Sequence, residues 1–257
     1  MVRPRRAAGC PAAPGRTVSV GDRMSMGEHS PRYPRSRGTA AIIPAWNEAL
    51  TVGSVVYAAL DSEMVDEVVV VDNASSDGTA GVAAAHGARV VYEPVPGKGE
   101  AMRTGVAAVA GAAVVVFLDA DLVGLRSEHV DRLVRTVADG DAAMACGLFD
   151  RGPLANPLFL HHLPVLTGQR AVRRDLFDRL DHADLRGYRV EAALNSLVAR
   201  ERLVRDDHVV AGLWHRTKQE KFGSPVLGHA TKMAMLATAC WSYARFAMGR
   251  SEPRPAG

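Results

Sequence analysis

Short apolar runs alternate with amphipathic segments along residues 39–150. The apolar runs are rich in β-branched residues, a composition typical of strands that are buried on both faces of a parallel sheet. The runs that predict strands are 39–44, 66–72, 88–93, 113–118 and 142–149. The segments between them predict helices at 49–60, from the turn at 75–78 to about residue 87, and within 97–111. This alternation predicts an α/β fold with a mostly parallel sheet flanked by helices.

The pattern is less regular after residue 150. We expect four further elements, a loop at 166–169, a short helix at 172–180, a longer helix at 188–202 and a strand at 204–213. Residues 225–248 predict an amphipathic helix, because apolar residues recur along one face. The predicted organisation is therefore a tail at 1–38, two successive parts at 39–150 and 151–225, and a C-terminal helix and tail at 226–257.

The charge of the chain is unevenly distributed. Residues 1–38 contain eight arginines and two acidic residues, a net charge of +6, although the whole chain carries only +3. The rest of the chain therefore carries −3, which does not favour a nucleic-acid-binding body. The tail is rich in Arg, Pro, Gly and Ser without an apolar period, so we expect it to be disordered.

The cysteines and the hydropathy favour a cytoplasmic protein. Cys10, Cys146 and Cys240 are far apart, which predicts neither a disulfide framework nor a metal cluster. We find no uncharged apolar stretch of about 18 residues or more, the length that a membrane span requires. The helix at 225–248 is expected to pack on the domain; the alternative is a peripheral contact with the inner face of a membrane.

The feature with most chemical information is Asp119-Ala120-Asp121, directly after the apolar run 113–118. Carboxylates at the carboxyl end of a parallel strand face the crevice where open α/β sheets bind ligands. A pair of carboxylates there suits Mg²⁺ or Mn²⁺, which in turn suits a diphosphate. An isolated Asp-x-Asp is more often a strand end whose acids cap a helix or face solvent, so the motif needs support from the rest of the chain.

That support comes from the other strand ends, which share the same edge of the predicted sheet. The segments concerned are 44–48, 72–79 and 96–99. Asp72 can accept hydrogen bonds from a ribose or a base, and Lys98 offers a positive charge for phosphate. Gly97 and Gly99 are expected to let the backbone approach a ligand closely. Neither Gly-x-Gly-x-x-Gly nor a Walker-type loop is present, which disfavours a dinucleotide or P-loop site.

Together these motifs resemble those of the family 2 glycosyltransferases, which have the Rossmann-like GT-A fold. The motifs are Ile43-Pro44-Ala45-Trp46-Asn47-Glu48, Val71-Asp72-Asn73-Ala74-Ser75-Ser76-Asp77-Gly78-Thr79, Gly97-Lys98-Gly99 and Asp119-Ala120-Asp121. The resemblance is strongest to glucosyl-3-phosphoglycerate synthases and dolichol-phosphate mannosyltransferases. It implies that 39–150 is the nucleotide-sugar-binding half and that 151–225 is the acceptor-side half.

The resemblance also implies roles for individual residues. Pro44, Ala45 and Glu48 would line the nucleoside pocket. Asp72 would contact the uracil or ribose, and Lys98 the base or the diphosphate. Asp121 would bind the metal directly and take part in catalysis, whereas Asp119 would hold the ribose or the water shell of the metal.

Two later segments extend the resemblance towards the acceptor and the metal. The segment Gly187-Tyr188-Arg189-Val190-Glu191 is similar to one in which the glutamate faces the acceptor, although Arg189 stands where the family has glycine. Glu191 is therefore our candidate for the acceptor-side base or orienting group. The segment Gly212-Leu213-Trp214-His215-Arg216 resembles the region that supplies a histidine as third metal ligand, which implies that His215 binds the metal.

The residues at 166–170 suggest an acceptor-binding loop. Gly168 permits close approach, Gln169 can hydrogen-bond a hydroxyl, and Arg170 can pair with a phosphate or carboxylate. Arg173 and Arg174 follow this loop, and we expect them to lie on the solvated face of a helix rather than to bind the acceptor.

The sequence thus predicts a metal-dependent glycosyltransferase. It would transfer a hexose from a nucleoside-diphosphate sugar, with UDP-glucose favoured over GDP-mannose, to a small phosphorylated or hydroxyl acceptor such as 3-phosphoglycerate. The alternatives are a polyprenyl-phosphate glycosyltransferase at the membrane face and a nucleotide-sugar-binding protein without turnover. The stereochemical outcome and a homodimeric state stay open.

Overall fold

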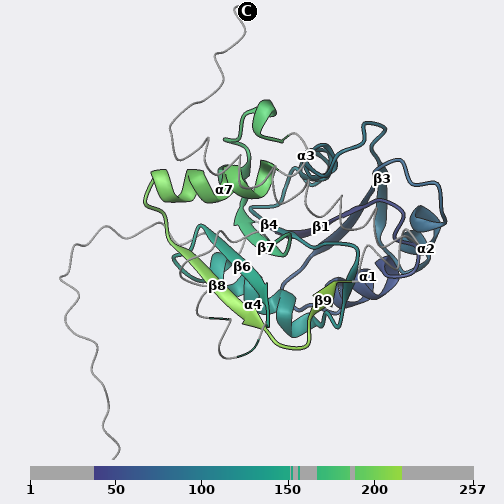
Figure 1. Cartoon of the computed structure of the whole chain (residues 1–257), viewed down its shortest axis with the longest axis horizontal. Helices are drawn as coiled ribbons and strands as arrows, with labels where there is room; N and C mark the ends of the chain where they lie inside the picture. The colour runs from purple at the N-terminus through teal and green to yellow at the C-terminus, as the bar shows by residue number, and fades with distance from the viewer. Residues whose placement is uncertain (1–37, 151, 153–155, 157–166, 186–188, 216–257) are drawn as a thin grey trace, which may run out of the picture. The chain divides into compact units, whose positions relative to one another are not determined.

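The structure is a computed structural model that describes residues 38–150, 152, 156, 167–185 and 189–215 (Figure 1). Within these residues, seven strands form one sheet in the order β3-β2-β1-β4-β7-β6-β8, and β5 and β9 pair separately. The strands are β1 (Thr39–Ala45), β2 (Glu67–Asp72), β3 (Arg89–Tyr92), β4 (Val114–Phe117), β5 (Leu122–Val123), β6 (Met144–Phe149), β7 (Arg170–Arg173), β8 (Arg205–Val210) and β9 (Trp214–His215). The helices are α1 (Val52–Leu60), α2 (Thr79–Ala85), α3 (Lys98–Ala108), α4 (Ser127–Ala138), α6 (Arg174–Phe177), the 3₁₀ turn η1 (His182–Leu185) and α7 (Arg189–Arg200).

The predicted mostly parallel α/β sheet is confirmed. Parallel pairs join β1 to β2, β1 to β4, β2 to β3 and β6 to β8. Among the described strands of this sheet, β7 alone is reversed, and it pairs antiparallel with both β4 and β6. Because an antiparallel strand begins where its parallel neighbours end, the start of β7 lies beside the carboxyl end of β4, with Arg170 opposite Phe117.

The buried runs face a separate core on each side of the sheet because successive strand residues point to opposite faces. Ile42 belongs to the core beneath α3, α6 and α7, and the next residue, Ile43, to the core beneath α1, α2 and α4. Figure 1 shows α3 and α7 on one side of the sheet and α1 and α4 on the other. Both faces are therefore covered, which explains why the central strands are continuously apolar.

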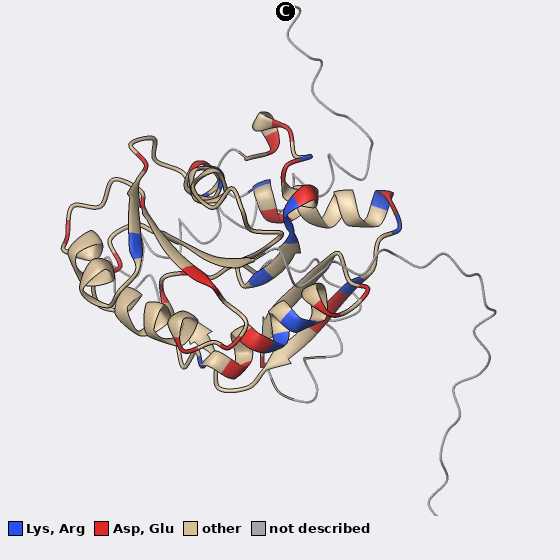
Figure 2. Ribbon diagram, turned by 180° about the vertical axis from the view of Figure 1, so that it is seen from behind, with Lys and Arg blue, Asp and Glu red and all other residues tan. Residues whose placement is uncertain are grey.

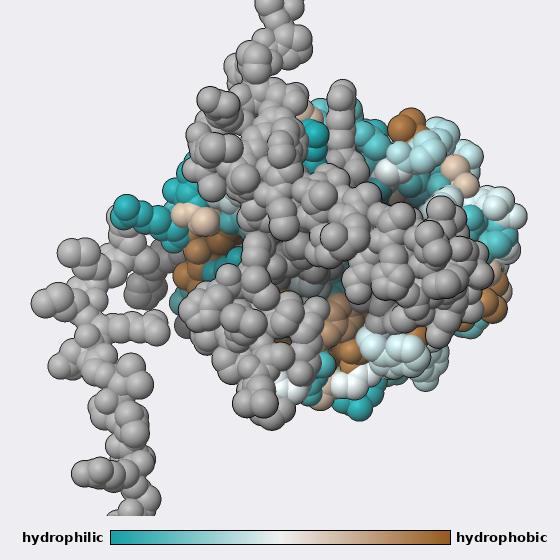
Figure 3. Space-filling view, viewed as in Figure 1, coloured by the Kyte–Doolittle hydropathy of each residue, from teal (hydrophilic) through white to brown (hydrophobic). Residues whose placement is uncertain are grey.

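The helix α4 shows how one face of a helix is selected for burial. Val130, Leu133, Val134 and Val137 recur at helical spacing and are buried. The remaining positions are largely polar, and the acidic residues Glu128 and Asp131 precede the basic residues Arg132 and Arg135 along the helix (Figure 2). On the face seen in Figure 3, the coloured hydrophobic residues form separate patches. No helix within the described ranges is long and apolar enough to cross a membrane.

One predicted element differs from the structure. The predicted helix at 172–180 begins instead as β7, and only Arg174–Phe177 is helical. Ala171 and Val172 are fully buried between β4 and β6, so sheet pairing determines their conformation. In a strand of only four residues followed directly by a helix, the periodicity of apolar residues is too short to distinguish this arrangement from a single continuous helix. The predicted tail before residue 38 and the helix at 225–248 lie outside the described residues.

Candidate active site

Three charged side chains from separate elements meet at the carboxyl edge of the sheet. Lys98 begins α3, Asp119 follows β4, and Glu191 lies in the first turn of α7. The Lys98 Nζ atom is 2.7 Å from Asp119 Oδ1 and 2.8 Å from Glu191 Oε1. The side chains of Lys98, Asp119 and Glu191 are only 19%, 17% and 8% exposed. The sequence predicted all three as site residues, and the structure brings them into one cluster.

The cluster keeps its lysine charged and leaves one carboxylate oxygen available. Burial disfavours the charge of Lys98, but the carboxylates of Asp119 and Glu191 outweigh this and raise its pKa. Glu191 Oε2 is buried and accepts no hydrogen bond from any residue that the structure describes. A buried acceptor of this kind suits a ligand group that donates a hydrogen bond.

The two glycines beside Lys98 have different roles. Gly97 has φ +152°, a conformation that residues with side chains rarely adopt, and it allows the chain to turn into α3. At Gly99, an added Cβ would lie 1.4 Å from the carbonyl oxygen of Leu185. Gly99 is therefore required for α3 to pack against η1. The expectation that Gly99 lets a ligand approach the backbone stays a prediction, and the packing against η1 is a second reason for a glycine at this position.

Asn73 holds the loop that leads to Lys98, a role the sequence analysis missed. Its Nδ2 donates to the carbonyls of Glu93 at 3.1 Å and Val95 at 2.7 Å, and its Oδ1 accepts from Gly97 N at 2.7 Å. The Asn73 residue is only 6% exposed. Its position next to Asp72 at a strand end was the available signal.

Asp119 is held from the opposite side by the segment before β7. Gln169 Nε2 donates to Asp119 Oδ2 over 2.9 Å, and the Gln169 residue is 1% exposed. At Gly168, an added Cβ would lie 2.1 Å from Asp119 Oδ1. The absence of a side chain there therefore leaves the space that the carboxylate occupies.

Arg170 does not lie in a surface loop, contrary to the expectation for an acceptor-binding cation. It is the first residue of β7 and is 0% exposed. Its guanidinium donates to the carbonyl of Thr167, with Nε at 3.1 Å, and to the carbonyl of Glu191 at 3.4 Å. The physical reason is the reversed strand, which places Arg170 between Phe117 and Cys146 inside the sheet.

The predicted nucleoside-side residues lie at the ends of β1 and β2. Pro44 pairs with Val71 and Ala45 with Asp72 in the parallel register. Asp72 is 7% exposed, and its Oδ1 accepts from Ser75 N at 3.2 Å. The first two strands therefore present Ala45 and Asp72 side by side, at the shared edge of the sheet where the sequence placed the ends of both strands.

The loops after β1 and β2 are joined by hydrogen bonds. Asn47 N donates to Ser75 Oγ at 3.0 Å, and Glu48 N donates to Thr79 Oγ1 at 2.8 Å. Asp77 accepts from Ala49 N at 3.2 Å and from Thr79. Burial alone would raise the pKa of Asp77, but the hydrogen bonds from Thr79 and Ala49 lower it. The backbone around Glu48 is thus fixed by the neighbouring loop.

Asp121 and His215 belong to adjacent segments. The antiparallel pair β5 and β9 places the backbone of His215 opposite Leu122, the residue after Asp121. Gly124, at φ +81°, permits this approach, because an added Cβ would lie 2.3 Å from the carbonyl oxygen of Gly212. The His215 side chain lies outside what the structure describes, and the described residues assemble no group of three metal ligands. The carboxylates of Asp119 and Asp121 nevertheless fit Mg²⁺ or Mn²⁺ chemically.

Residues 40–200 match the family model described as glycosyl transferase family 2. The chain belongs to this family. The matched range contains Lys98, Asp119, Asp121 and Glu191. The family predicted from the motifs is therefore confirmed.

The relatives of this family 2 chain include glucosyl-3-phosphoglycerate synthase of Mycobacterium tuberculosis, strain H37Rv, 38% identical over 128 residues. That match covers 46% of the chain and 39% of the relative, so the chain spans about two fifths of the curated relatives of this type. An uncharacterized glycosyltransferase of the same organism is 35% identical over 159 residues, which cover 54% of the chain and 71% of the relative.

Solved structures extend the similarity over more of the chain. A glucosyl-3-phosphoglycerate synthase from Mycobacterium tuberculosis, in complex with Mn²⁺, UDP-glucose and phosphoglyceric acid, has a TM-score of 0.67 and 25% identity, and the match covers 87% of both chains. A complex of the synthase from the same organism with Mn²⁺, UDP-glucose and glycerol 3-phosphate has a TM-score of 0.61 and 28% identity, covering 79% of this chain and 80% of the other. The predicted GT-A-type fold is confirmed.

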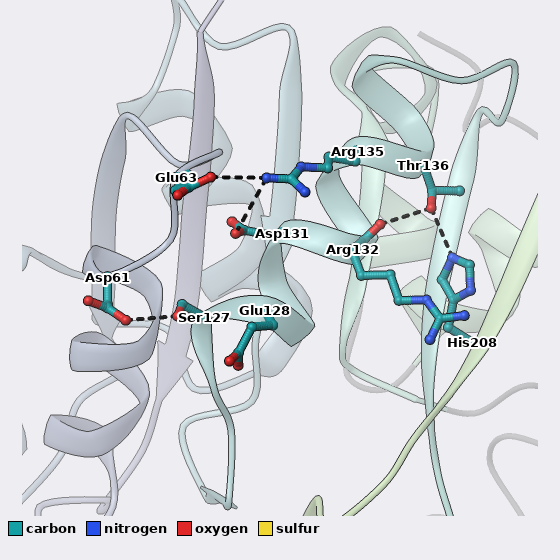
Figure 4. A pocket seen from close by; sticks show the side chains of 9 residues that line it. All are labelled: Asp61, Glu63, Ser127, Glu128, Asp131, Arg132, Arg135, Thr136 and His208. Atoms are coloured by element: carbon teal, nitrogen blue, oxygen red, sulfur yellow. Dashed lines mark hydrogen bonds and ion pairs between the residues drawn. The ribbon is translucent and has the colours of Figure 1, made fainter.

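A separate cavity of about 690 Å³ lies between the end of α1, α4 and β8 (Figure 4). Its charged groups largely pair with one another, as Arg135 does with Glu63 at 3.1 Å and with Asp131 at 3.9 Å. Thr136 Oγ1 donates to the carbonyl of Arg132 and lies 2.9 Å from His208 Nε2. None of the motif residues of the family 2 site lines this cavity.

Proposed function

We propose that this chain is a metal-dependent glycosyltransferase that transfers glucose from UDP-glucose to a small phosphorylated acceptor of the 3-phosphoglycerate type. The observation that carries the proposal is the cluster of Lys98, Asp119 and Glu191, because it joins the nucleotide-side motifs to the first turn of α7. The complexes of the related synthase with UDP-glucose and phosphoglyceric acid support the donor and the acceptor.

On the donor side, Pro44, Ala45 and Glu48 would line the nucleoside pocket and Asp72 would contact the uracil or ribose. Asp121 would hold Mg²⁺ or Mn²⁺, with Asp119 and His215 beside it. The bound metal would supply positive charge to the diphosphate. The two carboxylates support this assignment, since carboxylate oxygens are the ligands that Mg²⁺ and Mn²⁺ prefer.

Lys98 would stabilise the leaving diphosphate. Its raised pKa keeps it protonated, and its position is fixed by two carboxylates at hydrogen-bonding distance. A cation fixed in a largely buried site interacts more strongly with charge that develops during the reaction than a solvated cation does. No rearrangement of Lys98 is then needed as the diphosphate leaves.

Glu191 would receive the acceptor. Its Oε1 is paired with Lys98, whereas its buried Oε2 is available to accept a hydrogen bond from an acceptor hydroxyl. This contact would orient the hydroxyl or take its proton. Gln169 and Arg170 are not assigned to the acceptor, because their side chains are buried and hydrogen-bonded within the fold.

The test is a turnover assay on the full chain with UDP-glucose or GDP-mannose, with 3-phosphoglycerate or glycerol 3-phosphate, and with Mn²⁺ or EDTA. We expect UDP release and a hexosylated product only with UDP-glucose, 3-phosphoglycerate and metal. Glu191→Gln should lower turnover by roughly a hundredfold or more, the scale of a lost general base, with UDP binding unchanged. Metal-independent turnover, or turnover with GDP-mannose alone, would contradict the proposal.

A further inference from the structure

Gln169 contacts the site through Asp119. It lies just before the reversed strand β7 and is only 1% exposed, and its Nε2 atom is 2.9 Å from Asp119 Oδ2. The other carboxylate oxygen, Oδ1, faces Lys98 at 2.7 Å. Each oxygen of Asp119 therefore accepts from at least one protein donor, and Gln169 and Lys98 together fix the plane of the carboxylate.

The orientation of the Gln169 amide is itself determined. Its Oε1 is 2.5 Å from Thr167 Oγ1, which also lies 2.7 Å from the carbonyl of Gly147. A carboxylate can only accept hydrogen bonds, so the amide nitrogen must be the end that faces Asp119. At the other end, the single hydroxyl proton of Thr167 is shared between Gln169 Oε1 and the carbonyl of Gly147.

The backbone of this segment is anchored as well. Arg170 donates to the carbonyls of Thr167 and Glu191, and thus links the segment to the first turn of α7. Gly168 presents no side chain where the Asp119 carboxylate lies, since an added Cβ would be 2.1 Å from Oδ1. The segment 167–170 is therefore a buried support for one face of Asp119.

We propose that Gln169 is a positioning residue, which fixes the Asp119 carboxylate in the orientation needed to bind the metal-nucleotide complex. This inference rests on the proposed function, since it assigns Asp119 to the donor and metal side. The contacts from Gln169 and Lys98 orient the carboxylate, and its orientation determines the directions from which a ribose hydroxyl or a metal-bound water can approach it. Residues that orient a metal-site carboxylate commonly change metal affinity by about 10–100-fold when they are replaced.

The deciding variant is Gln169→Met, which keeps the length of the side chain and removes both polar ends. Mn²⁺ binding to the full chain in the presence of UDP is measured by electron paramagnetic resonance of free Mn²⁺, with folding checked by circular dichroism. We expect Mn²⁺ affinity to fall by about 10–100-fold. The matched control is Val134→Ala, a core truncation on α4, which should lower the melting temperature without changing Mn²⁺ affinity.

Thr167→Val is the milder second variant, because it removes the hydroxyl that fixes Gln169 Oε1 and keeps the side-chain shape. It should weaken Mn²⁺ binding in the same direction but less. In an Asp119→Ala background, Gln169→Met should cause no further loss, because residues that act through one another are not additive.

The outcomes separate the two proposals. If the wild-type chain binds no Mn²⁺ with UDP, the proposed function fails and the positioning role fails with it. If the wild type binds but folded Gln169→Met and Thr167→Val both stay within twofold of it, the positioning role alone is wrong. If Gln169→Met does not fold, the result for Thr167→Val decides.

Discussion

Replacing Lys98 by methionine should destabilise the protein strongly, because it leaves two carboxylates together in a largely buried site. Asp119 Oδ1 and Glu191 Oε1 lie 2.7 and 2.8 Å from the same nitrogen, so they are at most about 5.5 Å apart. At an effective dielectric constant of about 20, two like charges at that separation repel by about 3 kcal/mol. This agrees with the roughly 3–5 kcal/mol lost when one partner of a buried ion pair is removed.

The assay is urea unfolding of the full chain at pH 7, in which the unfolding free energy of Lys98→Met should be about 3 kcal/mol below that of the wild type. The melting temperature should fall by roughly 6–12 °C at this chain size. Arg135→Met is the matched control, since Arg135 and its partner Glu63 are 52% and 81% exposed. Exposed pairs are worth about 0–1 kcal/mol, so this variant should stay near the wild type.

A second substitution tests the cause. In the variant Lys98→Met with Glu191→Gln, one of the two negative charges is gone, and Asp119 still accepts from Gln169. This double variant should recover most of the lost stability. If it is instead less stable than Lys98→Met, or if Lys98→Met lies within about 1 kcal/mol of the wild type, repulsion between the carboxylates is not what Lys98 offsets.

Three further predictions follow from residues outside this cluster. Asn73→Ala removes three hydrogen bonds of the loop before Lys98, so it should lower the unfolding free energy by about 2–4 kcal/mol and weaken UDP binding. An unchanged UDP affinity in calorimetry would refute this role of Asn73. Gly124→Ala forces a side chain into a left-handed backbone position, where its Cβ would lie 2.3 Å from the carbonyl oxygen of Gly212. It should abolish the rise in melting temperature that Mn²⁺ with UDP gives the wild type. A rise equal to that of the wild type would show that the β5–β9 pair does not support the metal site. Burial lowers the pKa of His208, and Arg132 adds a smaller effect in the same direction, whereas Asp206 opposes them. As the pH falls below about 6.5, the unfolded chain therefore binds a proton at His208 before the folded chain does. Stability should therefore decline from pH 7.5 to 5.5, and His208→Gln should remove part of that decline in urea titrations.

In the first half of the fold, the sequence predicted the strands of the seven-stranded sheet and the first three helices because these elements obey local rules, whereas the helix α4 was not predicted. Strands β1, β2 and β4 are continuous apolar runs, and each ends in a polar motif at the same edge. Lys98 and Asp119 could be placed at that edge without a structure, since parallel strands determine which ends meet.

The second half could not be predicted in the same way, because it depends on contacts between distant residues. Arg170 and Gln169 have polar side chains after a glycine, which is the local pattern of a binding loop. Their burial follows from the insertion of β7 between β4 and β6, a strand order that local sequence does not reveal. Asn73 was missed for a related reason, since its partners Glu93, Val95 and Gly97 lie 20, 22 and 24 residues further along the chain.

The reversed strand also limits how this protein can diversify. Because β7 enters the sheet at the edge where its parallel neighbours leave it, the residues before Arg170 belong to the core and to the rim of the site at once. A change there that adapted the protein to a new acceptor would also alter the support of Asp119 and the attachment of α7. Selection for new acceptors should therefore leave residues 167–170 nearly unchanged and act on side chains that do not also hold the sheet together.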